Sequence, residues 1–409
     1  MKTFYKYNTF IILAYIILFP ILPSYGQINA DLILYLSIFY NLAGVIFSKN
    51  IREDLIKNLR LIYKDRIFIT LFLLNLLMYV STIYALDKRH SLVSSIRFSF
   101  YIYFFYLISY QLNKREDLKK AIYCFIFVAT ISGIDTFIKV INSTFRGIEI
   151  NEASRITSFL ENANNLGAYS VISLLMSIAI FIDTKNKKLK VAMCFSTLLL
   201  TLNIIFCQSR NALLALVIGI VIFILLYNKK LIMYSLIIPI VLLIVPQSRV
   251  RLIEILDFSQ NSSRVKIWTI AKYMIKDSPL KGKGYENFST NYESYLYQHA
   301  AEDLQVKVGY IPAHPHNAFL KFQSELGILG LTLFIIFLVI TALTIFKFYK
   351  SYNHSTFILG ILVIFLVFQF MNLLDCFYNV LKPMTAFLFS IAIANNININ
   401  YLNKRKNSS

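Results

Sequence analysis

The chain has 409 residues, of which 57% are hydrophobic and 15% are charged, and its formal net charge is +20. A soluble domain of this length has too little interior to bury so much apolar surface, so the composition excludes that class and indicates a polytopic membrane protein. No zinc-finger spacing or other nucleic-acid recognition motif accompanies the basic residues. We therefore attribute the charge to membrane topology and to contact with anionic membrane lipids, and we expect no nucleic-acid partner.

Apolar runs recur along the whole chain, and a spanning helix needs about 20 such residues. We predict an all-α polytopic integral membrane protein with about 12 transmembrane helices. The expected spans are residues 9–25, 29–48, 66–86, 91–112, 119–141, 165–183, 190–207, 211–228, 231–247, 318–347, 355–374 and 379–399. The expected parts are a nine-span region at 1–247, a large extracytoplasmic loop at 248–317 between spans 9 and 10, a three-span region at 318–399 and a tail at 400–409.

Basic residues are dense in alternate loops between these spans. Clusters at 49–66, 114–120 and 185–190 are separated by short loops with few or no Lys and Arg. Cytoplasmic loops of membrane proteins carry the excess of basic residues. We therefore expect both termini in the cytoplasm and the 248–317 loop on the outer side.

Residues 313–320 place two histidines and an asparagine directly before a long apolar run. Pro315 and Asn317 suit the first turn of a helix that starts there. The positive end of the helix dipole favours a neutral imidazole, and imidazole is the side chain best suited to accept a proton near neutral pH. We predict that His316 is a general base, whereas His314 either orients it or faces water.

Three polar segments carry arginines near the expected outer boundary. Arg210 lies in segment 208–211, which interrupts two apolar runs, and an arginine there costs free energy unless it reaches the interface or meets an anion. Arg264 opens an amphipathic helical run that suits the membrane surface or the ends of spans, although an ordinary surface position fits it as well. Arg155 lies at the outer end of the sixth expected span, and a phosphate contact is one possible role for it.

Other residues have structural and functional interpretations that the sequence leaves open. Segment 277–284 contains Pro and paired Gly, which indicates a turn that ends a helix in preference to a phosphate-binding loop. Asp375, at the outer end of the eleventh expected span, either orients His316, pairs with an arginine or caps the helix. Asp135 falls inside an expected span, and we assign it no role.

Three segments in series resemble the O-antigen ligase and polymerase superfamily of bacterial envelope-glycan enzymes. They are QSRNALL at 208–214, the segment from Ser263-Arg264 to PLKGKG at 279–284, and HPHN at 314–317 followed by ELG at 325–327. Their order, their spacing and the large loop before a long late helix match the superfamily. The motif-bearing part covers residues 155–330.

This resemblance implies transfer of a glycan from undecaprenyl pyrophosphate to a sugar hydroxyl, at the outer face of the bacterial inner membrane, without a metal, ATP or another cofactor. The acceptor of a ligase is lipid A-core, and that of a polymerase is another lipid-linked repeat unit. The presence of both family arginines favours a ligase, while an O-antigen or capsule polymerase remains the alternative. Contact with other envelope-glycan assembly proteins is compatible with either activity. The site implied is His316 and His314 as catalytic residues, Arg210, Arg264 and Arg155 for the pyrophosphate, and Asn317 and Asp375 in support.

Two other classes fit the sequence less well. Metal-dependent polytopic oligosaccharyltransferases carry acidic residues in their first outer loop, and residues 25–28 contain none. A flippase or transporter places charged sites near the membrane midplane, whereas here the polar clusters gather at the outer boundary. The four cysteines lack the C-x-x-C spacing of a zinc site, so no metal is predicted.

Overall fold

The computed structural model describes residues 2–24, 29–112, 114–152, 154–256, 262–299 and 311–408, and these residues contain helices but no strand. The α-helices are α1 (Lys2–Leu18), α2 (Asp31–Phe47), α3 (Lys49–Ile62), α4 (Arg66–Ser81), α5 (Lys88–Tyr106), α6 (Arg115–Phe145), α7 (Ala163–Asp183), α8 (Lys187–Phe206), α9 (Arg210–Asn228), α10 (Ile237–Ile244), α11 (Pro246–Leu256), α12 (Ser262–Asp277), α13 (Phe288–His299), α14 (Ala318–Ser351), α15 (Thr356–Leu374) and α16 (Leu381–Ser408). A π-helix, η1 (Leu107–Gln111), and two 3-10 helices, η2 (Lys229–Leu236) and η4 (Phe377–Asn379), complete the set.

Seven helices within the described ranges are long and apolar enough to cross a membrane. They are α5 continued by η1, α6, α7, α8, α9 continued by η2, α14 and α15. Helices α2 and α3 are bent by 118° relative to each other, and they raise the number to eight if the pair counts as one span. The protein is therefore an all-helical, multi-pass membrane protein, as predicted, whereas twelve spans are not confirmed.

The expected ninth span, residues 231–247, is not one continuous α-helix. The 3-10 helix η2 covers its beginning, α10 has only eight residues, and α11 starts at Pro246. Proline is tolerated in the first turn of a helix but not in its interior, because it lacks the N–H donor and clashes with the preceding turn. Pro239, in the first turn of α10, and Pro246 therefore each mark the start of a new short helix.

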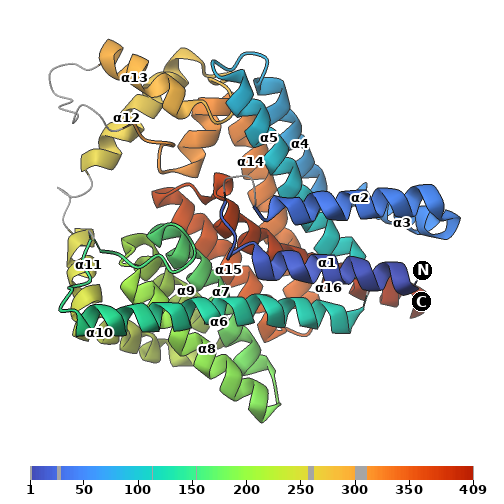
Figure 1. Cartoon of the computed structure of the whole chain (residues 1–409), viewed down its shortest axis with the longest axis horizontal. Helices are drawn as coiled ribbons and strands as arrows, with labels where there is room; N and C mark the ends of the chain where they lie inside the picture. Colours follow the sequence, from blue (N-terminus) through green and yellow to red (C-terminus); the bar gives the residue numbers. More distant parts are fainter. Residues whose placement is uncertain are drawn as a thin grey trace.

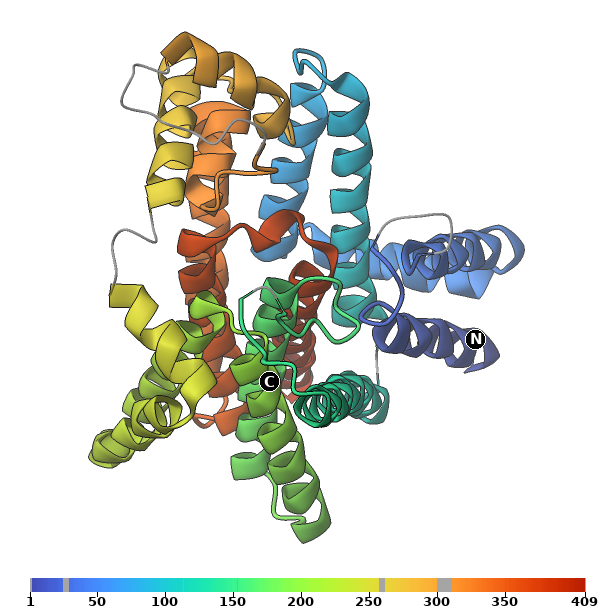
Figure 2. The same cartoon turned by 60° about the vertical axis from the view of Figure 1, so that its left-hand side comes forward.

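The expected loop at 248–317 is largely helical where the structure describes it. The predicted amphipathic helix is α12, and the predicted break follows it after Asp277. Apolar side chains of α12 and α13 form a small core of their own, and α12 packs against α14. Figures 1 and 2 show α12 and α13 beside α14 and the α4–α5 pair. Residues 257–261 and 300–310 of this loop, and residues 25–28 of the first outer loop, lie outside the described ranges.

Helices α7 and α15 are the most buried of the candidate spans and pack against each other at the centre of the molecule (Figure 1). The first turn of α7 carries Asn164, and α15 ends next to Asp375. At their other ends lie Asp183 of α7 and Thr356 of α15. The packing of α7 against α15 thus brings the polar groups of Asn164 and Asp375 together.

Candidate active site

The start of α14 is fastened to the end of α15 by Asn317. This residue caps α14, since its Oδ1 accepts a hydrogen bond from the Leu320 N–H at 3.0 Å. Its Nδ2 donates to the Leu373 carbonyl at 3.1 Å. From the sequence we expected Pro315 and Asn317 in the first turn of this helix, but both residues precede it. A side chain at a cap uses its oxygen to satisfy a free N–H, which is the more common use of asparagine at a helix start.

His316 lies beside Asp375 as a result of this fastening. The His316 backbone has φ of 48°, in the left-handed region, and its Nδ1 lies 3.1 Å from Asp375 Oδ1. Asp375 is buried, and the same carboxylate oxygen accepts a hydrogen bond from the Cys376 N–H at 2.9 Å. A carboxylate at Nδ1 selects the tautomer that carries the proton there, so Nε2 is left with its lone pair.

His314 belongs to the same cluster. Its Nδ1 accepts a hydrogen bond from the His316 N–H at 3.3 Å, and its Nε2 lies 3.9 Å from Asp375 Oδ1. Burial lowers the pKa of His314 to about 4, against the opposing effect of the Asp375 charge. Burial alone would raise the pKa of Asp375, but the hydrogen bond from His316 and the charges of the two imidazoles bring it down to about 2. Near neutral pH the cluster therefore combines a neutral His314 with an ionised Asp375.

Arg155 is joined to Asp375 through Asn164. The Arg155 Nη2 donates to Asn164 Oδ1 at 2.6 Å, and Asn164 Nδ2 donates to Asp375 Oδ2 at 3.2 Å. Arg155 Nε also donates to the Cys207 carbonyl at 2.9 Å, just before α9. Burial lowers the pKa of Arg155 below its ordinary value. Asn164 is a site residue that we did not predict, because its contact joins residues 211 positions apart.

Arg210 and Arg264 add two more cations. Arg210 is the first residue of α9, and its Nη1 is buried without a hydrogen-bond partner among the described residues. Arg264, half-buried in the first turn of α12, has a pKa lowered first by burial and also by the charge of Arg210, while Asp375 opposes the shift. A buried guanidinium N–H without an acceptor costs free energy, so Arg210 provides a donor that an anionic ligand can satisfy.

The same cluster has the ligand types of a metal site. One ligand atom from each of His314, His316 and Asp375 lies within 4.8 Å of the others, so these side chains could hold an ion. Two imidazoles and a carboxylate are a donor set that suits zinc. Asp375 already accepts three hydrogen bonds, from Asn164 Nδ2, His316 Nδ1 and the Cys376 N–H. The same contacts also suit a histidine base that Asp375 orients. Removal of metal by a chelator distinguishes this base from a metal site.

The predicted turn at 279–284 fits into a break in α14. Gly327 has φ of 67° and interrupts the helix, and a Cβ added to it would lie 2.1 Å from the Leu280 carbonyl oxygen. Three backbone hydrogen bonds join the two segments: Lys283 N–H to Ser324 O at 2.9 Å, Gly284 N–H to Glu325 O at 2.8 Å, and Ile328 N–H to Pro279 O at 2.8 Å. The PLKGKG and ELG motifs thus bind each other through their backbones and hold the 279–284 turn against α14.

A buried ion cluster lies one to two turns into α14, beyond His316. Lys321 Nζ lies 2.7 Å from Glu286 Oε1 and 2.9 Å from both carboxylate oxygens of Glu325. Burial alone would raise the pKa of Glu286, but the Lys321 charge outweighs it and the pKa lies below its ordinary value. We did not predict this cluster, although Lys and Glu four residues apart in an apolar helix were its signal. Asp135 has a local structural role: it pairs with Lys139 at 2.8 Å and accepts from Ser158 Oγ at 2.7 Å.

Comparison with protein families identifies the segment that carries most of these residues. Residues 195–335 match the family model of the O-antigen ligase, and this range includes Arg210, Arg264, His314, His316 and Asn317. A comparison with curated proteins finds no match. Arg155, Asn164 and Asp375 lie outside the matched range and reach the site through the fold. The resemblance noted in the sequence is therefore confirmed at residues 195–335, which match the O-antigen ligase family model of the O-antigen ligase and polymerase superfamily.

Proposed function

We propose that this protein is an O-antigen ligase that transfers a polysaccharide from undecaprenyl pyrophosphate to a sugar hydroxyl of lipid A-core, at the periplasmic face of the bacterial inner membrane. The family match supports glycan transfer at the coarser level. The donor, the acceptor and the membrane face belong to the proposal. The observation that carries it is the 3.1 Å contact between His316 and Asp375, together with a buried Arg210 Nη1 for which the described residues supply no acceptor.

In the proposed reaction His316 is the base. Asp375 holds the Nδ1–H, and Nε2 takes the proton of the acceptor hydroxyl as that oxygen attacks the anomeric carbon. The new bond joins the acceptor oxygen to the anomeric carbon, while the bond from that carbon to the phosphate oxygen breaks. A single displacement of this kind inverts the anomeric configuration. The carboxylate of Asp375 stabilises the imidazolium that forms, as the buried aspartate of a catalytic triad does.

The leaving lipid pyrophosphate takes the electron pair of the broken bond and gains negative charge. Guanidinium groups bind phosphate oxygens through paired N–H donors, and such preorganised donors stabilise the transition state. Arg210 supplies its Nη1, which has no partner among the residues that the structure describes, and Arg264 supplies a second cation. Arg155 is already bound to Asn164 and the Cys207 carbonyl. Its role is therefore to hold the Asp375 carboxylate through Asn164 and to add positive charge nearby.

Complementation of a gene deletion tests the proposal. The strain receives the wild type, His316→Asn or the control His354→Asn, and its envelope glycans are separated on a gel. Both substitutions are at residues with left-handed φ, 48° and 52°, which asparagine tolerates. A ligase predicts that the deletion and His316→Asn lack polymer on lipid A-core while polymer accumulates on undecaprenyl pyrophosphate. Lipid A-core capped by a single repeat unit would instead indicate a polymerase, and full activity of His316→Asn would contradict the assigned base.

A further inference from the structure

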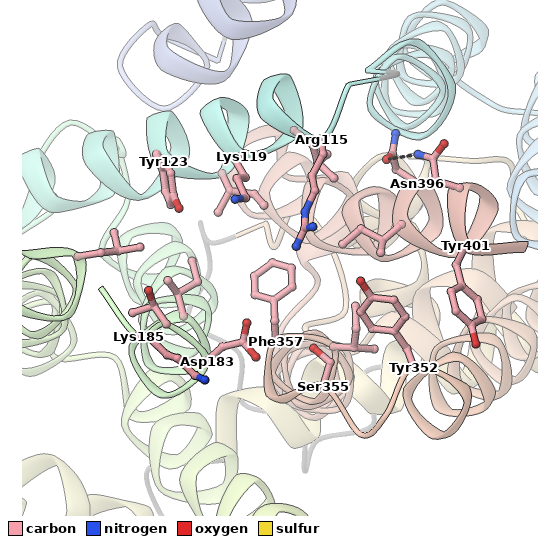
Figure 3. Close-up of a pocket in the computed structure, with 18 residues that line it drawn as sticks. Arg115, Lys119, Tyr123, Asp183, Lys185, Tyr352, Ser355, Phe357, Asn396 and Tyr401 are labelled. Atoms are coloured by element: carbon pink, nitrogen blue, oxygen red, sulfur yellow. Dashed lines mark hydrogen bonds between the residues drawn. The ribbon is translucent and has the colours of Figure 1, made fainter. Parts of the chain in front are cut away.

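A cavity of about 640 Å³ lies at the opposite end of the central helices from the candidate active site. It is lined by the end of α7 around Asp183 and by the start of α15 at Phe357, whereas Asn164 and Asp375 lie at the other ends of these helices. The first turns of α6 and residues 396–401 of α16 close it on the other sides (Figure 3). Helices α6, α7 and α15 are candidate spans, so the cavity lies at the depth where membrane meets water.

Three basic side chains line the cavity against a single carboxylate. Arg115 and Lys119 are four residues apart on α6 and so share one face of that helix. Figure 3 shows both side chains reaching from α6 into the cavity. Lys185 and Asp183 line it from the end of α7 and the residues that follow. Within the described part of the chain, none of the three basic groups forms an ion pair, whereas the neighbouring Lys120 pairs with Asp117 at 3.4 Å.

The remaining lining is apolar or amphipathic except for the neutral polar side chains of Thr184, Ser355, Asn396 and Asn400. Tyr123 and Tyr352 bring rings with hydroxyl groups, which are common where a membrane protein crosses the interface. The apolar residues come from α6, α7, α8, α15 and α16 and are Leu118, Ile122, Ile180, Leu189, Phe357, Ile358 and Ile397. The basic side chains need an anionic partner, and the apolar wall needs apolar contacts. A ligand that fills this cavity therefore combines an anionic group with an apolar chain.

We propose that the cavity binds an anionic phospholipid whose headgroup carries hydroxyls, such as phosphatidylglycerol. The phosphate lies on Arg115 and Lys119, where charge-assisted hydrogen bonds are strong. A headgroup hydroxyl donates to Asp183, and the start of one acyl chain lies along the apolar wall. Basic pockets between membrane helices on the cytoplasmic side bind such headgroups. The basic loops place this face in the cytoplasm, so the lipid comes from the cytoplasmic leaflet. The site is separate from the proposed transfer reaction and does not depend on it.

Native mass spectrometry of the purified full-length protein tests this proposal, with phosphatidylglycerol as the probe. The test variant is Arg115→Gln combined with Lys119→Gln. The matched control is Lys57→Gln combined with Arg60→Gln, which removes the same two charges from exposed positions of α3 that do not line the cavity. We expect the test variant to bind the lipid about ten-fold more weakly, because each basic residue adds to the binding free energy of an anionic headgroup. The control should bind the lipid like the wild type.

A second variant, Ser355→Glu, places a carboxylate at the cavity edge with little structural cost, since the Ser355 side chain caps no backbone N–H of α15. We expect it to lose the lipid adduct while its helical circular dichroism stays unchanged. Equal binding by the wild type and both cavity variants overturns the proposal. An adduct that inorganic phosphate displaces completely at millimolar concentration also overturns it, because that result indicates a free-phosphate site without a contribution from the acyl chain.

Discussion

His316 and Asp375 lie 59 positions apart in the chain, yet His316 Nδ1 and Asp375 Oδ1 are separated by only 3.1 Å. Asn317 explains this proximity, because it caps α14 and at the same time binds the Leu373 carbonyl near the end of α15. The histidine before the cap is consequently held at the residue that follows α15. This pair defines the orientation of the proposed base, and the predictions below depend on it.

Asp375→Asn should lower kcat of glycan transfer strongly while leaving the fold intact. An amide at this position donates a hydrogen bond to His316 Nδ1, so the proton moves to Nε2 and the base is lost. The equivalent change in a serine protease triad costs about 10⁴-fold, and we expect about 10²-fold or more here. Steady-state kinetics of the purified protein measure it, with Glu53→Gln on the exposed face of α3 as the control. A kcat within two-fold of the wild type would show that Asp375 does not orient the base.

Arg210→Lys and Arg264→Lys should each lower kcat/KM by about 10- to 100-fold, although both keep the positive charge. Lysine cannot reproduce the paired N–H donors of guanidinium on a pyrophosphate. Arg60→Lys on the exposed face of α3 is the control. Transfer assays with a lipid pyrophosphate donor measure the effect. Retention of full activity in either variant would remove that arginine from the pyrophosphate site.

The pKa of His314 predicts how stability changes with pH. Burial places it at about 4 in the folded protein, below the ordinary 6.5. Between these values the unfolded chain binds a proton that the folded chain does not, so the free energy of unfolding falls as the pH drops from 6.5 to 4, by at most about 3 kcal/mol. Asp375 adds a second loss only below its ordinary pKa, towards about 2. The apparent melting temperature of the wild type should therefore fall as the pH drops from 6.5 to 4. In His314→Gln the melting temperature should change less over the same pH range. An unchanged slope in the variant contradicts the burial of a neutral His314.

Chelation distinguishes an oriented base from a metal centre at His314, His316 and Asp375. We expect EDTA to leave the transfer rate unchanged, and added zinc to inhibit it by occupying the two imidazoles. Rates before and after dialysis against EDTA, with metal content measured on the same samples, decide the question. A rate that is lost on chelation and restored by one metal would assign these residues as ligands.

Features that depend on local sequence were predictable. The amphipathic pattern predicted α12, and Pro279 with the paired glycines predicted where that helix ends. The HPHN segment predicted the start of α14 to within a few residues. Asp375 was a candidate partner of His316 because it ends an apolar run. Each of these features follows from hydrophobic periodicity, turn residues or helix boundaries.

Features that depend on contacts between distant segments were not predictable. The link from Arg155 through Asn164 to Asp375 and the Lys321–Glu286 pair need the folded arrangement of four or more helices. Lys321 and Glu325 gave a local signal by their spacing in α14, but nothing in the sequence indicated Glu286 as the partner of Lys321 or Asn164 as the link to Asp375. The division of residues 231–247 was missed for another reason, because hydropathy averages over Pro239 and Pro246 and does not register the missing backbone donors.

The role of His316 as the base is tested most directly by a transfer assay with purified protein, a lipid pyrophosphate-linked glycan and lipid A-core, which compares His316→Asn with His354→Asn. Both changes remove an imidazole at a left-handed residue, so backbone strain is matched. We expect His316→Asn to lose at least about 10²-fold in kcat, because the general base is missing, while His354→Asn retains the wild-type rate. Equal rates for the two variants would contradict the assignment of His316 as the base.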